Sequence, residues 1–118
     1  MEDIEIKEEK GYILINISGD VELEDAANIG KLLDNYILED HSCLAFQLLG
    51  SGFLDSAALA MFASRAMIIA KTSGIMGFVA IPLECLSILK VTKLDGHFFY
   101  VNSEEELKTL VAQRKSKK

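Results

Sequence analysis

The stretch CLAFQLLGSGFLDSAAL, residues 43–59, predicts a strand that passes through a short turn into a helix. Its first seven residues are almost free of polar side chains, which is typical of a strand that is covered on both faces or central in a sheet. A Gly-Ser-Gly turn follows, and residues 57–70 continue as an apolar segment without Pro or Gly. We expect the rest of the chain to be arranged around this strand-turn-helix unit.

Asp55 and Ser56 lie at the predicted start of the helix. The first N–H groups of a helix have no partner within it, and Asp and Ser are residue types that cap them. One interpretation is that one of the two residues is an N-cap and nothing more. The other is that a hydroxyl is displayed at the positive end of the helix dipole, where a phosphate is favoured.

Strands and helices alternate along the remainder of the chain. Period-two and helical spacings of apolar residues predict the order β-β-α-β-α-β-α-β-α, an α/β fold. The predicted strands are residues 4–7, 12–17, 43–49, 75–81 and 98–101, and the predicted helices span about 24–37, 57–70, 82–91 and 103–111. The first two strands form a hairpin, whereas the others are expected to be parallel with right-handed crossovers, so the sheet is mixed. Because the chain is short, we expect helices mainly on one face.

Several local expectations follow from residue type. Gly74 is expected at the C′ position of the central helix, and Pro82 in the first turn of the next one. Cys85 or Leu86, with Leu89 and Val91, should form the buried edge of that short helix. The segment 103–106, SEEE, predicts a capping box at the start of the last helix.

The helix at 57–70 is unusually apolar on both sides. One side should pack on the sheet; it consists of Leu59, Phe62, Ala63, Ala66, Ile69 and Ala70. The other side begins with a small, smooth patch beside Ser56, made of Ala57, Ala60, Met61 and Ser64. A helix that is apolar all round is usually buried against something. Two covers stay open: a neighbouring helix of this domain, or another protein.

Length and charge limit the possible functions. The 118 residues, half of them hydrophobic, predict one domain over residues 1–112, followed by a basic tail, 113–118, that we expect to be a frayed end. Residues 1–55 carry 13 acids and 3 bases (−10) and residues 56–118 carry 5 acids and 9 bases (+4), which gives the net charge of −6. An acidic body disfavours nucleic acid, whereas a basic partner surface would suit the N-terminal half.

Other features predict a cytoplasmic protein with reduced thiols. No apolar run approaches the ~20 residues that span a bilayer, and the acidic N-terminus lacks a signal-peptide layout. Cys43 and Cys85 lie in apolar runs, where free cysteines behave as small buried hydrophobes. His41 and His97 belong to no recognisable triad, and neither a phosphate-binding loop nor a metal-ligand spacing occurs. We therefore expect neither an enzyme nor a bound cofactor.

Three segments carry a resemblance to a known family. Residues 53–59, FLDSAAL, resemble the strand-to-helix signature of the STAS family, the sulfate transporter and anti-sigma factor antagonist domains. Residues 19–22, GDVE, are similar to the family's turn after the second strand, and residues 89–95, LKVTKLD, are similar to its Leu-x-[Leu/Met]-[Thr/Ser]-Gly-Leu-Asp segment. Order and spacing match from about residue 4 to 112. The resemblance implies the fold described above, with helices mainly on one face.

The resemblance also implies a function. In the anti-sigma factor antagonists of the family, the Ser after the Asp is phosphorylated by a serine kinase that is also the anti-sigma factor; phosphorylation breaks the complex, and a phosphatase restores it. The matching residue is Ser56, with Asp55 as its neighbour. The expected partner surface surrounds it and consists of Asp20, Glu22, Asp55, Ser56, Ala57, Ala60, Met61 and Ser64. We expect a monomer or a weak dimer.

The chain departs from the family pattern in ways that leave alternatives. Ala57 stands where the family has a second small hydroxyl residue, and Ala58 stands where it has Gly, which places a methyl where a kinase loop would approach closely. Gln47 stands where relatives commonly have an acidic or amide residue, and Glu22 stands where the family's turn has an Asp. A non-phosphorylated STAS scaffold or sensor, with Ser56 as a plain cap, is one alternative. A nucleotide or small-ligand-binding domain, with an anion site at the helix N-terminus, is the other.

Overall fold

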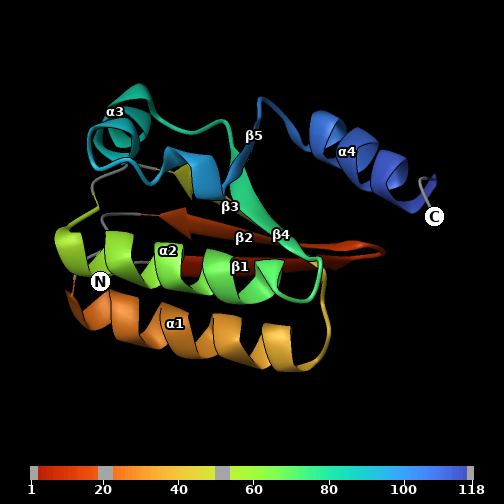
Figure 1. Ribbon diagram of the computed structural model, residues 1–118, viewed down its shortest axis with the longest axis horizontal. Coiled ribbons are helices and arrows are strands. Elements are labelled where there is room, and N and C mark those ends of the chain that lie inside the picture. Colours follow the sequence, from red (N-terminus) through yellow and green to blue (C-terminus); the bar gives the residue numbers. More distant parts are fainter. Residues whose placement is uncertain (1–2, 19–22, 50–53, 117–118) are drawn as a thin grey trace.

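The computed structural model describes residues 3–18, 23–49 and 54–116 (Figure 1). Its elements are β1 Asp3–Glu9, β2 Tyr12–Ser18, α1 Leu23–Leu38, β3 Cys43–Leu49, α2 Ser56–Ala70, β4 Ile75–Val79, α3 Leu83–Val91, a short 3-10 helix Asp95–His97, β5 Phe99–Val101 and α4 Glu104–Ser116. The predicted α/β order is confirmed over these residues. The 3-10 helix is an addition that the sequence pattern did not predict.

The described strands form one mixed sheet in the order β1-β2-β3-β4-β5. β1 pairs with β2 in the antiparallel sense, and each later neighbour pair is parallel. Both expectations about the strand at 43–49 are confirmed, because β3 is central and its alternate residues are buried on both faces. The carboxyl ends of the parallel strands therefore lie at one edge of the sheet, and α2 begins there.

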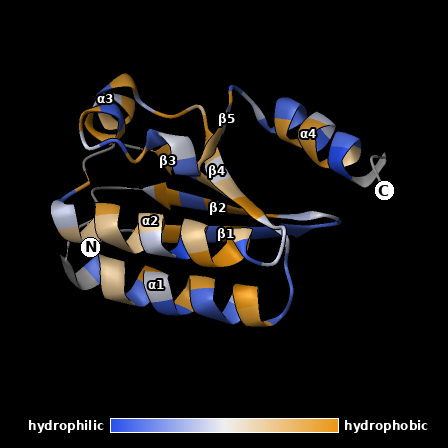
Figure 2. Ribbon diagram, viewed as in Figure 1, coloured by the Kyte–Doolittle hydropathy of each residue, from blue (hydrophilic) through white to orange (hydrophobic). Residues whose placement is uncertain are grey.

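Figure 1 shows α1 and α2 on one side of the sheet and α4 on the other. α3 adds Cys85 and Leu89 to the same core as α1 and α2, whereas α4 belongs to a separate, smaller core. The smaller core under α4 contains Tyr12, Leu14, Cys43, Ala45, Val79, Leu107 and Val111. The expectation that helices cover mainly one face is thus confirmed. Figure 2 shows less hydrophilic colour on α2 than on α1, which agrees with the position of α2 over the centre of the sheet.

Three phenylalanines anchor α2 on the sheet. The ring centroids of Phe46 in β3 and Phe62 in α2 lie 4.8 Å apart, and that of Phe78 in β4 lies 5.9 Å from Phe46 and 5.8 Å from Phe62. The rings are tilted or edge-on to one another, as aromatic pairs prefer. This cluster holds α2 over β3 and β4 and thereby fixes the position of its first turn.

Two predicted helix ends are wrong in detail. α2 ends at Ala70, and the residue in the left-handed conformation after it is Ser73, with φ of 65°, rather than Gly74. Gly74 is buried, and a Cβ placed on it would lie 2.6 Å from Cγ1 of Ile69. Lack of space, and not the C′ conformation, explains that glycine. Pro82 is the N-cap of α3 and not part of its first turn.

The segment around α3 shows two further corrections. β4 ends at Val79 and not at residue 81, because Ala80 adopts a φ of 52° that breaks the extended backbone. Cys85 and Leu89 are buried as predicted, but Val91 is 82% exposed, because it lies in the last turn of α3 away from the core. The aromatic strand is confirmed as β5, which begins one residue later than predicted.

Polar contacts hold both ends of α4. The Ser103 hydroxyl accepts from the Glu106 N–H at 3.2 Å, but Glu106 accepts from the N–H of Asn102, so the predicted capping box is formed in part. The expectation of a frayed tail is wrong for residues 113–116, because these residues continue α4. Arg114 donates a hydrogen bond to the carbonyl oxygen of Ser73 at 2.6 Å. The basic segment is therefore helical as far as Ser116.

Glu104, the first residue of α4, joins the helix to the opening hairpin. The Tyr12 hydroxyl donates to its carboxylate at 2.5 Å, and Lys7 Nζ forms an ion pair with it at 2.9 Å. The bond from Tyr12 is the main cause that holds the pKa of Glu104 below its usual range, and the bond and charge of Lys7 act in the same direction.

Both cysteines are buried free thiols, as predicted. Burial raises the pKa of Cys43 to about 12 and that of Cys85 to about 11, so neither is an activated thiolate. Of the helices that the structure describes, none combines the length and apolar character needed to cross a membrane. Within residues 3–18, 23–49 and 54–116, no three His, Cys, Asp or Glu side chains form a group that could hold a metal ion.

Candidate functional site

The junction between β3 and α2 is the candidate site, and Asp55 is its N-cap. The Asp55 backbone is extended, with φ of −84° and ψ of 178°, and its Oδ1 accepts from the Ala58 N–H at 2.9 Å. The carboxylate thus satisfies one of the N–H groups that a helix start leaves without a partner. Of the two residues proposed from sequence as the cap, Asp55 fills the role.

Ser56 is the first residue of α2, and its side chain is exposed. Because Asp55 supplies the cap, the interpretation of Ser56 as a plain cap is wrong. Its hydroxyl faces solvent at the positive end of the α2 dipole, where negative charge is favoured by about 0.3–1 kcal/mol. The arrangement is suited to carrying an anionic group on the Ser56 oxygen.

Ala58 does not present its methyl group to an approaching protein. Its side chain is fully buried in the main core, whereas Ala57 is half-buried and Ser56 is exposed. The expectation that the methyl of Ala58 stands where a kinase loop approaches is therefore wrong. The cause is the helix period, which turns position 58 toward the sheet while position 56 faces outward.

The structure divides the expected patch on the outer side of α2. Met61 is only 6% exposed and belongs to the main core, because α1 lies beside α2 and covers it (Figure 1). For this residue, the cover is the neighbouring helix of the same domain. Ala60 is exposed and Ser64 is half-buried. Ala70, expected to face the sheet, is exposed instead, because in the last turn of α2 it is Ile69 that points into the core.

A hollow lies between α1 and α2 directly beyond Ser56. We call it the α1–α2 hollow; it has a volume of about 420 Å³ and is lined by Ala26, Ala27, Ala57, Ala60, Met61, Ser64 and Arg65. Four of the predicted site residues, Ala57, Ala60, Met61 and Ser64, are thus brought together. Ala26 and Ala27 of α1 and Arg65 of α2 complete the lining, and none of these three was predicted from the sequence as a site residue.

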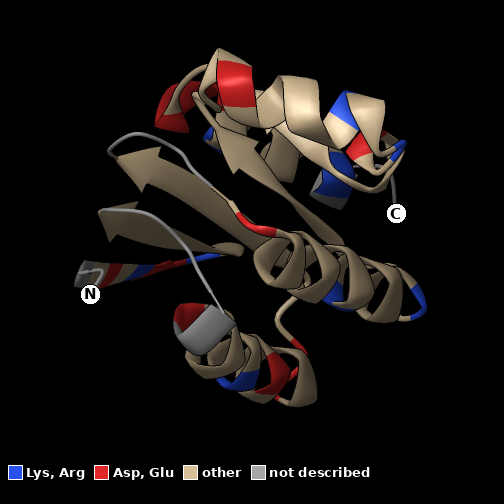
Figure 3. Cartoon of the chain, turned by 90° about the vertical axis from the view of Figure 1, so that its left-hand side faces the viewer, with Lys and Arg blue, Asp and Glu red and all other residues tan. Residues whose placement is uncertain are grey.

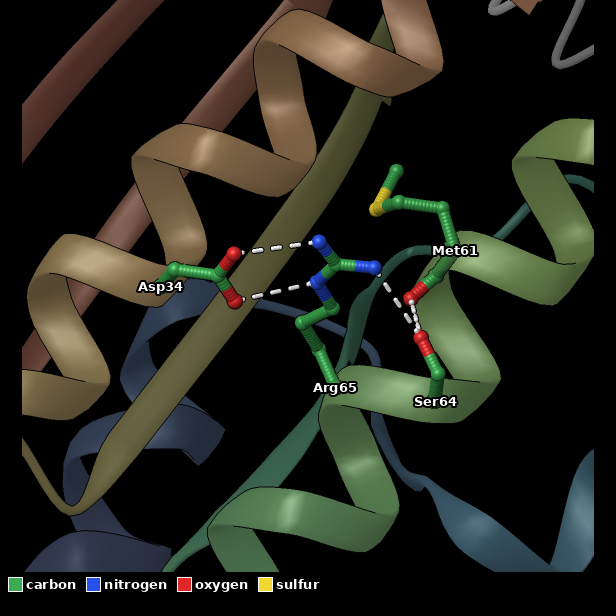
Figure 4. A network of polar contacts seen from close by, with 4 residues as sticks. All are labelled: Asp34, Met61, Ser64 and Arg65. Carbon is green, nitrogen blue, oxygen red and sulfur yellow. Dashed lines mark hydrogen bonds and ion pairs between the residues drawn. The ribbon is translucent and has the colours of Figure 1, made fainter.

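An ion pair closes the far end of the hollow (Figure 4). Arg65 donates from Nε and Nη2 to the two carboxylate oxygens of Asp34 in α1, both at 3.1 Å. Its Nη1 donates to the Ser64 hydroxyl at 3.1 Å, and that hydroxyl donates to the carbonyl oxygen of Met61 at 2.9 Å. We call this network the Asp34–Arg65 clasp.

Gly30, in the middle of α1, makes room for the clasp. A Cβ placed on it would lie 2.9 Å from Nη2 of Arg65 and 3.3 Å from Cγ of Met61. Glycine costs about 1 kcal/mol relative to alanine inside a helix, so its presence there is a signal of close approach. That glycine could have pointed to a contact from sequence, but it could not have identified the partner side chain.

Charge around the site is mostly acidic. Figure 3 shows an acidic residue at the start of α2 and further acidic residues on α1. Asp20 and Glu22, which were predicted for the partner surface, lie outside the residues that the structure describes. The described part of the site is therefore the exposed Ser56, its cap and the α1–α2 hollow.

Comparisons with known proteins bear on this chain. The family model of the STAS domain matches residues 3–108. No curated protein sequence matched the chain. Among solved structures, an anti-sigma factor antagonist from Mycobacterium paratuberculosis is similar, with 19% identity, a TM-score of 0.80 and coverage of 95% of each chain.

Two structures of one further protein are also similar. The anti-sigma factor antagonist SpoIIAA in its unphosphorylated form is 12% identical, with a TM-score of 0.78 and coverage of 92% of this chain and 96% of that one. The Bacillus cell fate determinant SpoIIAA in the phosphorylated form is also 12% identical, with a TM-score of 0.72 and coverage of 92% and 99%. At these identities the likeness is one of fold.

Proposed function

Because the chain belongs to the STAS domain family, we propose that it is an anti-sigma factor antagonist that binds an anti-sigma factor with serine kinase activity and is released by phosphorylation of Ser56. The observation that carries the proposal is the exposed Ser56 side chain at the first position of α2, beside a cap that Asp55 already supplies. In this proposal the chain is the substrate of a kinase and not itself an enzyme.

Phosphorylation at this position would leave the fold intact. A phosphate adds about −1.5 to −2 charges at neutral pH. At the N-terminus of α2 these charges lie in the favourable end of the helix dipole. Asp55 keeps its bond to Ala58, and Phe62, through which the phenylalanine cluster anchors α2, lies on the buried side of the helix, whereas Ser56 is exposed. The modified chain should therefore have nearly the stability of the unmodified one.

The same phosphate would oppose binding. A partner that covers Ser56 must remove the phosphate from water and place it beside the Asp55 carboxylate, and both effects are unfavourable. The modification thus acts on the complex and not on the free protein, as a switch requires. A serine phosphatase would restore the binding form, and both reactions would take place in the cytoplasm.

The structural neighbours support this proposal through their fold. SpoIIAA is an anti-sigma factor antagonist whose structure is known in unphosphorylated and phosphorylated forms, and both are similar to this chain along most of its length. A fold of this kind therefore accommodates a phosphate in a relative.

Mass spectrometry of the purified protein tests the proposal. The wild-type chain, Ser56→Ala and Ser87→Ala are incubated with ATP and an extract of the native cell, and then measured as intact proteins and as peptides. Ser87 is an exposed serine in α3 and serves as the matched control. We expect one phosphate on wild type and Ser87→Ala, mapped to Ser56, and none on Ser56→Ala. A wild-type chain that stays unmodified would contradict the switch and favour a constitutive STAS binding module.

A further inference from the structure

We propose that the α1–α2 hollow receives one aliphatic side chain of a protein partner, and that basic residues flank this side chain in the partner. The inference rests on the proposed function and names the chemistry of the partner at the same site. Ala57 and Ala60, which form one wall of the hollow, follow Ser56 on the same helix. A protein that covers Ser56 therefore also reaches the hollow.

The lining has the chemistry of an apolar receptor. Side chains of packed helices normally interdigitate, so small residues on both helices leave space between them. Here Ala26 and Ala27 of α1 face Ala57 and Ala60 of α2 across the hollow, which is open to solvent. Met61 lies buried beneath it, and its flexible thioether side chain can adapt to the shape of an inserted group.

The polar groups at the hollow are engaged with one another, which argues against an anionic ligand. The positive charge of Arg65 is balanced by Asp34 through two hydrogen bonds, and its Nη1 donates to the Ser64 hydroxyl. The Ser64 hydroxyl in turn donates to Met61. The groups left to contact a bound side chain are the alanine methyl groups and the thioether of Met61. An aliphatic side chain is therefore the group that fits the hollow.

The Asp34–Arg65 clasp bridges the two helices that form the walls of the hollow. It joins α1 to α2 at the far end, and Arg65 lies against Gly30, where no larger residue fits without displacing it. A preformed receptor loses little conformational entropy on binding, which favours affinity.

The charge near the hollow selects the flanking residues of the partner. Glu24 and Asp25 directly precede Ala26 in α1, and Asp55 precedes the hollow on the other helix. The bases on the same stretch of the two helices are Lys31 and Arg65, of which Arg65 is paired with Asp34. Because charges across an interface are complementary, the partner segment should carry Lys or Arg beside its aliphatic residue.

Filling the hollow tests the inference. Ala60→Leu and Ala27→Leu fill it from α2 and from α1, while Ala112→Leu makes the same change on the exposed face of α4. Leucine is a good helix former, so all three variants should fold, which circular dichroism checks. Random peptides displayed on phage are selected on the unphosphorylated wild-type chain, and the Kd of each enriched peptide is measured for all four proteins.

We expect the enriched peptides to share an aliphatic residue flanked by Lys or Arg. Their affinity should fall at least about tenfold for both filled variants and by less than about twofold for Ala112→Leu. No enrichment, enriched peptides without this pattern, or equal affinity for Ala60→Leu and wild type would each overturn the inference. The peptide selection does not depend on a kinase. An unmodified Ser56 in the mass measurement would therefore refute the phosphorylation switch, and the peptide affinities would still test the hollow separately.

Discussion

Removing the cap of α2 is the perturbation that tests how the candidate site is built. In Asp55→Ala, the Ala58 N–H loses the carboxylate oxygen that accepts from it at 2.9 Å. Loss of an Asp cap costs about 0.5–2 kcal/mol and typically about 1 kcal/mol. Because the bond has ordinary length and is half-buried, we expect a value near the middle of that range.

That loss is large enough to measure. A small domain is stable by about 5–15 kcal/mol, and for a chain of this size 1 kcal/mol lowers Tm by about 3–6 °C. Asp55→Asn is the matched control, because Asn retains an acceptor oxygen and ranks with Asp as a cap. We expect Asp55→Asn to remain within a few tenths of a kcal/mol of wild type.

Urea unfolding at neutral pH, followed by circular dichroism, compares the three proteins. An unchanged midpoint for Asp55→Ala would refute the assignment of Asp55 as the cap. Equal destabilisation of Asp55→Asn and Asp55→Ala would show that the negative charge, and not the hydrogen bond, is what α2 requires. Either result would also weaken the argument that the Ser56 hydroxyl is left for modification.

Two further predictions concern the sheet and its outer helix. Gly77→Ala in β4 should lower the free energy of unfolding by about 1–3 kcal/mol, because the added Cβ overlaps the carbonyl oxygen and ring of Phe99. The control is Gly96→Ala, which should stay within about 1 kcal/mol of wild type because nothing lies within 4 Å of the added Cβ. Equal urea midpoints for the two variants would contradict this prediction. The pKa of Glu104 is lowered in the folded state, so its contribution to stability is present above the ordinary value of 4.5 and is lost as the pH falls through the lowered one. Glu104→Gln should therefore lose less stability than wild type when the pH falls through this range. Urea unfolding of both proteins at several pH values measures the difference. Equal losses of unfolding free energy in the two proteins would refute the role of Glu104.

Much of the fold was predictable because its signals are local. The strand at 43–49 lacks polar residues, and the last helix opens with Ser103 and three acids; each pattern lies within a few neighbouring residues. Period and residue type were therefore enough to predict the order of the elements and the mixed sheet. The exact ends were less predictable, since Ser73 and Ala80 adopt left-handed backbone conformations that residue type does not favour.

The sequence by itself also determined that Asp55 and Ser56 begin a helix after a central strand. Only the tertiary structure decided that Asp55 is the cap, that Met61 is covered by α1, and that Arg65 pairs with Asp34. These outcomes depend on how two helices, separated in the chain by a strand, lie beside each other on the sheet. Local propensity acts over a few residues, whereas that arrangement is set by packing against the sheet as a whole, so the hollow beside Ser56 emerges only when the chain is folded.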